Sequence, residues 1–252
     1  DEAEGTGTTV IGGVLSDMEF VFGDTSWVKG LFESHAMDGT DGVAFHPYHM
    51  NAKSSARVFT RFRDTVAPYG FAGKIWVNEV GFPTRKSFPR TVKEAQMPET
   101  VVKTITLLAA GGARNFFWYH IFDDDSFGLV DDSTKPWRKK GGYWAYALCA
   151  NNLAGKGFRA GTYQKTMPSK TRSFYFEGIE GSRVLIVWNE SVFFKKTLSV
   201  SLGGAKHRRW NVAAGTSEDI SLDNGVYTAT LYASGGNDPA AKPSLLFLTW
   251  DE

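Results

Sequence analysis

The sequence contains almost no cysteine and no long apolar run. Cys149 is the only cysteine among 252 residues, which excludes an internal disulfide, a cysteine zinc site and an iron–sulfur cluster. No stretch of about 18 apolar residues is present, so we expect no membrane span. An excess of one charge is also lacking, because 28 Lys+Arg balance 27 Asp+Glu to give a net charge of +1. This balance argues against nucleic acid as a partner, since such proteins concentrate positive charge.

Aromatic residues, by contrast, are abundant. The chain contains 8 Trp, 9 Tyr and 19 Phe, in a composition that is 42% apolar and 22% charged. Those proportions are typical of a folded globular protein and exclude disorder as the main state. Aromatic rings fill cores, and they also line carbohydrate-binding clefts, where a ring stacks on the apolar face of a sugar.

The first 155 residues alternate between short apolar runs and helical patterns. A helix over Ala52–Ala67, for example, is indicated by apolar residues spaced four apart and by the proline that follows it. The other expected helices are Trp27–Ala36, a segment from Pro98 to the Gly111-Gly112 pair, and Gly142–Leu153, and the expected strands are Val10–Leu15, Gly42–Tyr48, Lys74–Glu79 and Asn115–Phe122. Repeated strand–helix units predict a parallel sheet covered by helices.

After Gly155 the pattern changes to short β-branched or aromatic runs separated by turns. The expected strands are Ser173–Phe176, Val184–Trp188, Thr197–Leu202, Trp210–Val212, Ile220–Leu222, Val226–Leu231 and Leu245–Trp250. Asp223-Asn224-Gly225, between two of these strands, predicts a hairpin. We therefore expect two domains, an α/β domain over residues 1–155 and an antiparallel β-sandwich over residues 156–252.

Glu79 is the strongest candidate for a catalytic residue. It closes an apolar strand in the sequence WVNEVGFPT, where Gly81 and Pro83 turn the chain away. In a parallel α/β fold the carboxyl ends of the strands form the active-site face, so a carboxylate there is a candidate nucleophile or base. The alternative is a solvated or salt-bridged glutamate at a strand end.

His46 and Tyr48 close the preceding strand, in the sequence FHPYH. Strand alternation places both on the face that also carries Gly42 and Ala44. A tyrosine hydroxyl beside a nucleophilic carboxylate can donate a hydrogen bond that keeps the carboxylate ionised, and the histidine could contact a substrate hydroxyl. The alternative for His46 is a hydrogen-bonded group of the core.

The sequence FWYHIFDDD closes the last expected strand of the first domain, and alternation places Trp118 and His120 on one face. A tryptophan there could give a sugar a flat stacking surface, or it could be core filler. The three consecutive aspartates lack the spacing of a calcium loop. Asn189-Glu190-Ser191 matches the N-glycosylation pattern, which is frequent by chance.

Taken in order, FHPY, WVNEVGFPT and FWYHIFDDDSFGLVDDSTKPWRKKGGYWAYALCANNLAG resemble the second half of a clan A retaining glycoside hydrolase. Such enzymes are (β/α)8 TIM barrels, and families 39 and 5, some with an appended sandwich, are the most similar. The resemblance extends over about residues 8–155. It implies that the first domain supplies strands 5 to 8 of the barrel.

The resemblance also implies roles for individual residues. Strand 7 of these enzymes ends with the nucleophilic glutamate, which matches Glu79, and strand 6 supplies the surrounding ring groups, which match His46 and Tyr48. Strand 8 supplies an aromatic floor, which matches Trp118. The neighbouring residues Asn78 and His120 are further candidates for substrate binding. The implied activity is a retaining O-glycosidase for a β-linked oligo- or polysaccharide, secreted or extracytoplasmic, that needs no cofactor or metal.

One part of the family pattern is missing. A retaining glycosidase needs a second carboxyl group as general acid/base, usually in an Asn-Glu pair at the end of strand 4. The Asn-Glu pairs here are Asn78-Glu79 and Asn189-Glu190, and the second lies in the expected sandwich. We therefore expect this chain to be the C-terminal part of a longer enzyme, with the N-terminal half-barrel as a separate chain, as in two-chain heparanase-like hydrolases. A truncated chain or a non-catalytic relic is the alternative. The alternatives are a non-catalytic carbohydrate-binding or scaffold protein and a transglycosylase.

Overall fold

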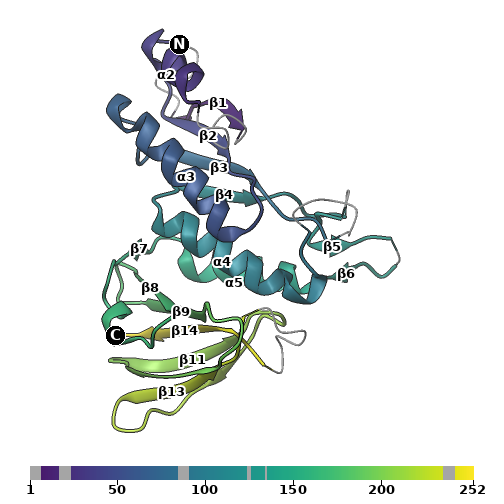
Figure 1. The fold of residues 1–252 in the computed structure, drawn as a ribbon, viewed down its shortest axis with the longest axis vertical. Helices are drawn as coiled ribbons and strands as arrows, with labels where there is room; N and C mark the ends of the chain where they lie inside the picture. The colour runs from purple at the N-terminus through teal and green to yellow at the C-terminus, as the bar shows by residue number, and fades with distance from the viewer. Residues whose placement is uncertain (1–6, 17–23, 85–90, 124–125, 134, 235–241) are drawn as a thin grey trace. The chain divides into compact units, whose positions relative to one another are not determined.

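The computed structural model describes residues 7–16, 24–84, 91–123, 126–133, 135–234 and 242–252 (Figure 1). The chain forms two compact units. Unit 1 consists of Asp1–Thr91 and Lys103–Gly128, and unit 2 consists of Val92–Val102 and Leu129–Glu252. This division into units does not test the expected domain boundary after residue 155, which stays a prediction.

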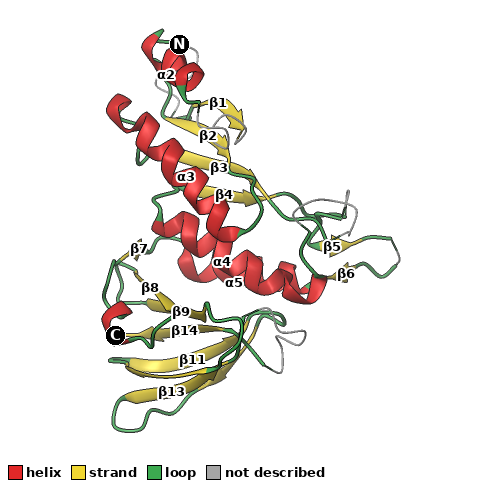
Figure 2. Cartoon of the chain, viewed as in Figure 1, coloured by secondary structure: helices red, strands yellow, loops and turns green. Residues whose placement is uncertain are grey.

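Unit 1 is built on a four-stranded parallel sheet in the order β1-β2-β3-β4. The strands are β1 (Ile11–Ser16), β2 (Gly42–His46), β3 (Ile75–Val80) and β4 (Asn115–Trp118). The connecting helices are α2 (Ser26–Glu33), α3 (Ala52–Val66) with the short 3₁₀ turn η1 (Ala67–Tyr69), and α4 (Met97–Ala110), which begins in unit 2. The predicted strand–helix alternation and parallel sheet are therefore present, and α3 and α4 lie along one face of the sheet (Figure 2).

Helix α3 shows how the sequence fixes that face. Asn51 caps its first turn, because its side chain accepts from the Ser54 backbone while the Ser54 hydroxyl accepts from the Asn51 backbone. The helix buries one apolar stripe against the sheet. Phe62 from that stripe stacks on Phe45 of β2, with ring centroids 4.1 Å apart and planes within 2°. Phe45 therefore points to the helix-covered face, and its strand neighbours Ala44 and His46 point to the opposite face.

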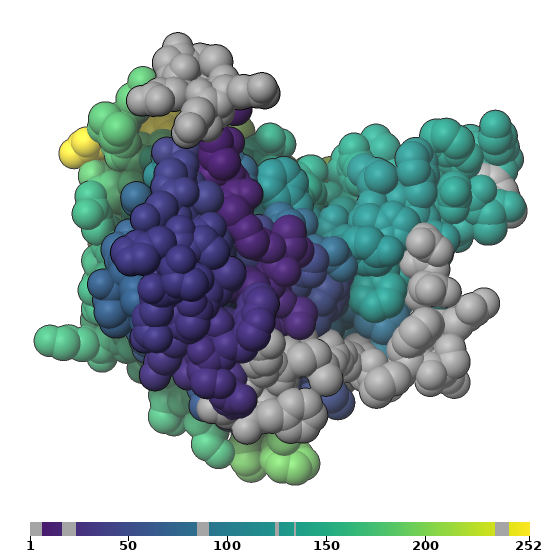
Figure 3. Space-filling model, turned by 90° about the horizontal axis from the view of Figure 1, so that it is seen from above, coloured from purple at the N-terminus to yellow at the C-terminus, as the bar shows by residue number. Residues whose placement is uncertain are grey.

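The opposite face of this sheet is apolar and open in the described part of the chain. Val14 of β1 pairs in register with Ala44 and is 66% exposed. Trp76 of β3 also pairs with Ala44. Its ring stacks on Phe117 of β4, with centroids 6.4 Å apart, and Phe117 is 49% exposed. Figure 3 looks onto the β1 edge, where the darkest purple atoms lie at the surface.

Unit 2 contains antiparallel strands, as predicted. A six-stranded sheet has the order β12-β11-β14-β9-β8-β7, and β10 pairs with β13 in a separate two-stranded sheet. The elements of unit 2 are η2 (Glu94–Gln96), β5 (Val130–Asp131), β6 (Arg138–Lys139), α5 (Gly141–Leu153), β7 (Gly157–Phe158), η3 (Gln164–Thr166), β8 (Thr171–Glu177), β9 (Arg183–Asn189), β10 (Lys196–Ser201), β11 (Ala205–Asn211), β12 (Thr216–Asp219), β13 (Val226–Leu231) and β14 (Leu245–Asp251). A shared apolar core contains residues of both sheets, among them Leu185, Leu198 and Leu248.

Two of the strand predictions are wrong in detail. Ile220–Leu222 is not a strand, because the pairing segment is β12, which ends at Asp219. The predicted turn at Asn224 and Gly225 does form, with φ of 49° and 78°. Asp223 and Val226 close this turn with reciprocal backbone hydrogen bonds and a single antiparallel bridge. The predicted hairpin extends no further, because the strands on its two sides join different sheets. The expected strand Asn115–Phe122 is also shorter and ends at Trp118.

Candidate active site

The carboxyl ends of β2, β3 and β4 lie at the same edge of the parallel sheet. His46 is the last residue of β2, and Tyr48 follows two residues later. Glu79 is the penultimate residue of β3. Because parallel strands run in one direction, their C-terminal ends bring these three side chains together, as strand-end residues do in α/β enzymes.

An irregularity in β3 determines the face of the sheet to which the Glu79 side chain points. Asn78 and Glu79 lie opposite the single residue Phe117 of β4, within a register shift between Val77 and Val80. Strict alternation would send Glu79 to the helix-covered face. The extra residue acts as a β-bulge, which reverses that alternation and re-aims a side chain. Glu79 therefore reaches the face on which His46 lies.

Glu79 has a defined hydrogen-bond environment. The Tyr48 hydroxyl donates to Glu79 Oε1 over 2.8 Å, and His46 Nδ1 lies 3.5 Å from Oε2. The Glu79 side chain is 32% exposed and that of His46 is 17% exposed. The arrangement thus offers an oriented, partly exposed carboxylate that a substrate can approach.

His46 has an unused hydrogen-bonding atom. Its Nε2 is buried and has no hydrogen-bond partner among the described residues. Buried polar atoms are normally paired, so an unpaired one at a candidate site calls for an explanation. A substrate hydroxyl group that entered beside Glu79 could supply the missing partner.

The loop after β4 also contributes to the site, and the sequence did not indicate this. Phe127 contacts the Tyr48 ring edge-to-face, with centroids 6.3 Å apart. The loop carbonyl of Tyr119 comes so close to Gly81 that a Cβ there would be only 2.3 Å away. Only glycine permits this approach, and the GFPT sequence after Glu79 was the one available signal.

The structure places each of the remaining predicted site residues in its own surroundings. Trp118 is 8% exposed and packs on Phe82, with centroids 6.1 Å apart. Asn78 is exposed. His120 lies against Tyr119, with ring centroids 4.5 Å apart. The proposed contacts of Trp118, Asn78 and His120 with a sugar stay predictions.

The glycosylation pattern at Asn189 belongs to the fold of unit 2. Asn189 is fully buried, and its Nδ2 donates to the carbonyl oxygens of Phe194 at 2.7 Å and Tyr232 at 2.9 Å. Its Oδ1 accepts from the Ser191 backbone at 2.9 Å. The nitrogen that a glycan would occupy is therefore used to hold two chain segments together.

Neither a metal cluster nor a membrane-spanning helix is found in the described residues. No group of three or more His, Cys, Asp or Glu side chains there could hold a metal ion. No helix in the same part of the chain is long and apolar enough to cross a membrane.

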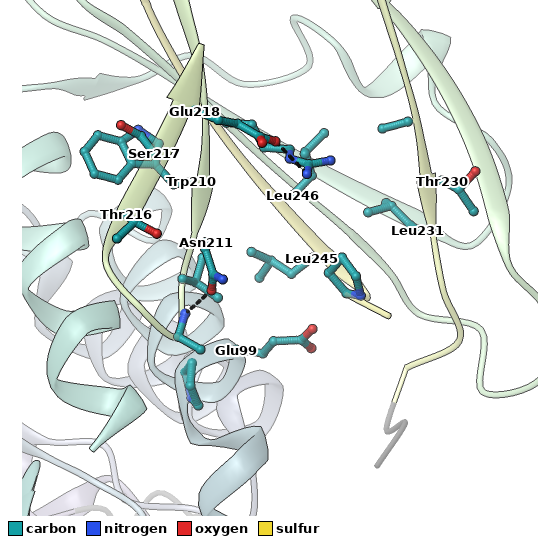
Figure 4. Close-up of a pocket in the computed structure, with 16 residues that line it drawn as sticks. Glu99, Trp210, Asn211, Thr216, Ser217, Glu218, Thr230, Leu231, Leu245 and Leu246 are labelled. Carbon is teal, nitrogen blue, oxygen red and sulfur yellow. Dashed lines mark hydrogen bonds and ion pairs between the residues drawn. The ribbon is translucent and has the colours of Figure 1, made fainter. Parts of the chain in front are cut away.

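Unit 2 has a hollow of its own, with a volume of about 350 Å³ (Figure 4). The buried Glu99 carboxylate lies in its wall and accepts from the Ser244 backbone at 3.0 Å and from the Ser244 hydroxyl at 2.5 Å. Arg209 and Glu218 form an ion pair of 2.6 Å in the same wall. Apolar and neutral polar side chains complete the lining, among them Leu231, Leu245, Leu246, Asn211, Thr216 and Thr230.

The fold resembles that of several glycoside hydrolases. A family 51 α-L-arabinofuranosidase from Bifidobacterium longum aligns with a TM-score of 0.62 and 12% identity, covering 98% of this chain and 60% of its own. An endo-β1,6-glucanase aligns with a TM-score of 0.56 and 13% identity, covering 94% and 48%. A conserved exported protein from Bacteroides fragilis aligns with a TM-score of 0.55 and 13% identity, covering 83% and 45%.

These likenesses establish a fold of the glycoside hydrolase type, in agreement with the clan-level resemblance of the sequence. This chain spans about half to three-fifths of the length of those structures. No protein-family model and no curated protein sequence matches it. The narrower resemblance to families 39 and 5 stays a prediction.

Proposed function

We propose that this chain carries the nucleophile of a retaining O-glycoside hydrolase and that Glu79 is that nucleophile. The observation that carries the proposal is the 2.8 Å hydrogen bond from Tyr48 to a half-exposed Glu79 carboxylate. It lies at the carboxyl ends of a parallel sheet, where α/β enzymes place their catalytic groups. The likeness of the fold to glycoside hydrolases supports the same assignment.

In the proposed mechanism, a Glu79 oxygen attacks the anomeric carbon as the bond to the leaving oxygen breaks. A second carboxylic acid protonates that oxygen, and the glycosyl–enzyme ester forms. The second group, now a carboxylate, removes a proton from water, which attacks the anomeric carbon and releases Glu79. Tyr48 holds Glu79 oriented, while His46 Nε2 binds a substrate hydroxyl.

The second carboxyl group is proposed to come from an N-terminal half-barrel chain. Parallel sheets are normally covered on both faces. Here the face that carries Val14, Trp76 and Phe117 is open, and β1 and β4 are the edges of the described sheet. Four more strand–helix units would cover that face and pair with those edges, which would place strands 5 to 8 in a closed barrel.

The proposed substrate is a β-linked oligo- or polysaccharide. The similar structures include enzymes named for α-linked arabinofuranosides and for β1,6-glucan, so the β linkage rests on the sequence resemblance. A transglycosylase would use the same residues with a sugar hydroxyl as acceptor. The proposed location is secreted or extracytoplasmic, and the likeness to an exported protein supports it.

The test is substitution of Glu79 in the protein purified with any bound partner. We expect Glu79→Ala to lower glycoside hydrolysis at least about a thousandfold, because no covalent intermediate can form. Added azide should then restore cleavage and give a glycosyl azide of inverted configuration. Glu180→Gln, which changes an exposed glutamate in a turn of unit 2, is the control. Near-normal hydrolysis by Glu79→Ala would contradict the assignment.

A second candidate function is carbohydrate binding without catalysis. The observation in its favour is the hollow of unit 2, whose leucine floor and hydroxyl and amide walls match the mixed surface of a sugar (Figure 4). It predicts that Ala229→Trp, which adds a large ring at a core-facing position in the lining of the hollow, abolishes oligosaccharide binding measured by calorimetry. Catalysis at Glu79 predicts instead that Ala229→Trp leaves turnover unchanged.

A further inference from the structure

Phe127 occupies a specific place between two aromatic residues at the candidate site. Its ring meets Tyr48 at an interplanar angle of 88°, with centroids 6.3 Å apart. It meets Tyr119 at 76°, with centroids 5.7 Å apart. Edge-to-face pairs of this kind are favourable because the positive ring edge faces the negative ring face. Tyr48 therefore contacts Phe127 with its ring and donates a hydrogen bond to Glu79 with its hydroxyl.

The segment that carries Phe127 is tied to the segment that follows Glu79. The Thr84 backbone N–H and hydroxyl both donate to the Ser126 carbonyl, at 2.9 and 3.1 Å. The ring of Phe127 lies 3.2 Å from the position that a Cβ would take on Gly81. Two hydrogen bonds and the contact at Gly81 thus fix the position of Phe127 relative to the segment that follows β3.

A second glycine shapes the other end of this segment. The Gly128 backbone N–H donates to the Asp123 side chain at 3.1 Å. A Cβ on Gly128 would lie 2.5 Å from the backbone of Asp123, which is too close for any other residue. Gly128, the residue after Phe127, therefore lies directly against the backbone of Asp123.

We propose that Phe127 is a positioning residue, which holds the Tyr48 ring so that its hydroxyl donates to Glu79. The inference rests on the proposed function of this site and adds to it a residue outside strands β2 and β3. A tyrosine ring can rotate about two side-chain bonds, and the contact with the Phe127 ring restricts that rotation. Leucine at position 127 would fill part of the space without providing a ring.

The first test detects the hydrogen bond from Tyr48 to Glu79 directly. The Tyr48 hydroxyl proton should give a slowly exchanging NMR signal, which can be assigned by its absence in Tyr48→Phe. We expect Phe127→Leu to lose the signal and Phe127→Tyr, which keeps the ring, to retain it. Phe193→Leu, which removes an exposed ring in unit 2, is the control. Melting curves identify any variant that fails to fold, and Phe127→Met, a second substitution that removes the ring, then takes the place of Phe127→Leu.

The second test measures kcat and KM of the complete enzyme. Phe127→Leu should lower kcat between about tenfold and a hundredfold, as expected for a misplaced catalytic group. KM should stay nearly unchanged, and Phe127→Tyr should restore kcat.

The two proposals fail in different ways. If Phe127→Leu keeps both the hydroxyl signal and kcat while Tyr48→Phe lowers kcat, the positioning role is wrong and the proposed function stands. If Phe127→Leu loses the signal while Glu79→Ala hydrolyses normally, the positioning role stands and the proposed function is wrong.

Discussion

The candidate site depends on individual residues that the sequence predicts unequally. Strand-end position was enough to select Glu79, alternation added His46 and Tyr48, and the structure places these side chains in contact. Their catalytic roles stay predictions. The bulge at Asn78 and Glu79 could not be foreseen, because it depends on the register with β4. Phe127 escaped prediction for a related reason, since a loop residue shows no periodicity.

The Tyr48 hydroxyl can be tested by removal of a single oxygen. Tyr48→Phe keeps the ring between Glu79 and Phe127 but loses the 2.8 Å hydrogen bond. A hydrogen bond to a charged group contributes about 1.5–3 kcal/mol, so we expect kcat to fall between about tenfold and a hundredfold. Steady-state kinetics on the complete enzyme would measure this effect.

A matched control for Tyr48→Phe exists in the same unit. The Tyr69 hydroxyl donates to Glu33 at 3.0 Å on the exposed surface, so Tyr69→Phe removes a similar bond away from the site. It should leave kcat unchanged. Equal kinetics of the two variants would show that the Tyr48 bond has no part in the reaction.

Whole elements were more predictable than their pairing. Helix α3 begins after its cap at Asn51 and ends before Pro68. Both limits follow from residues next to the helix in the sequence, without any tertiary contact. The Asn224-Gly225 turn likewise adopts the positive φ angles that its residues permit. Which strands then pair is decided by the core, so β13 pairs along its length with β10 and meets the segment before the turn only at the Asp223–Val226 bridge.

Strand β8 should make unit 2 sensitive to alkali. Burial, and then the hydrogen bond that Tyr175 donates to Glu177, raise the pKa of Tyr175 to about 12 from its ordinary 10.0. Folding thus favours the neutral phenol. This contribution to stability is fully present below about pH 10 and is lost as pH rises toward about 12.

Denaturant unfolding of the wild type and of Tyr175→Phe would measure that loss. The free energy of unfolding of the wild type should fall across this pH range, with part of the slope absent in Tyr175→Phe. Burial also raises the pKa of the neighbouring Tyr163, so some slope should remain. Identical slopes would show that Tyr175 titrates alike in the folded and unfolded chain.

The whole molecule combines a parallel α/β unit with an antiparallel unit, and composition and periodicity predicted both. A run of strand–helix repeats gives way after Gly155 to short β-branched segments, and this change of period is visible without any structure. The grouping of residues 92–102 with unit 2 was not visible. Helix α4 is continuous, and only tertiary contacts divide it between two units.

The open face of the parallel sheet leads to a prediction about assembly. Val14 and Phe117 are 66% and 49% exposed, and Phe117 stacks on Trp76. Covering an apolar sheet face of this kind lowers the free energy, because apolar surface is removed from water. We therefore expect native mass spectrometry of the protein from its source to show a second polypeptide of about 15–25 kDa, the size of half a barrel with additions. Denaturation should release it from the 27.8 kDa chain.

A charge on the open face should prevent that association. Phe117→Glu would place a carboxylate where the proposed half-barrel would pack, and burial of an unpaired charge is costly. The second polypeptide should therefore be lost from the native complex, and hydrolysis should be lost with it, because the proposed acid/base group would leave with that polypeptide. Phe193→Glu, at an exposed position of unit 2, should retain both. If the 27.8 kDa chain hydrolyses glycosides alone, the partner is unnecessary, and the acid/base group must then belong to this chain.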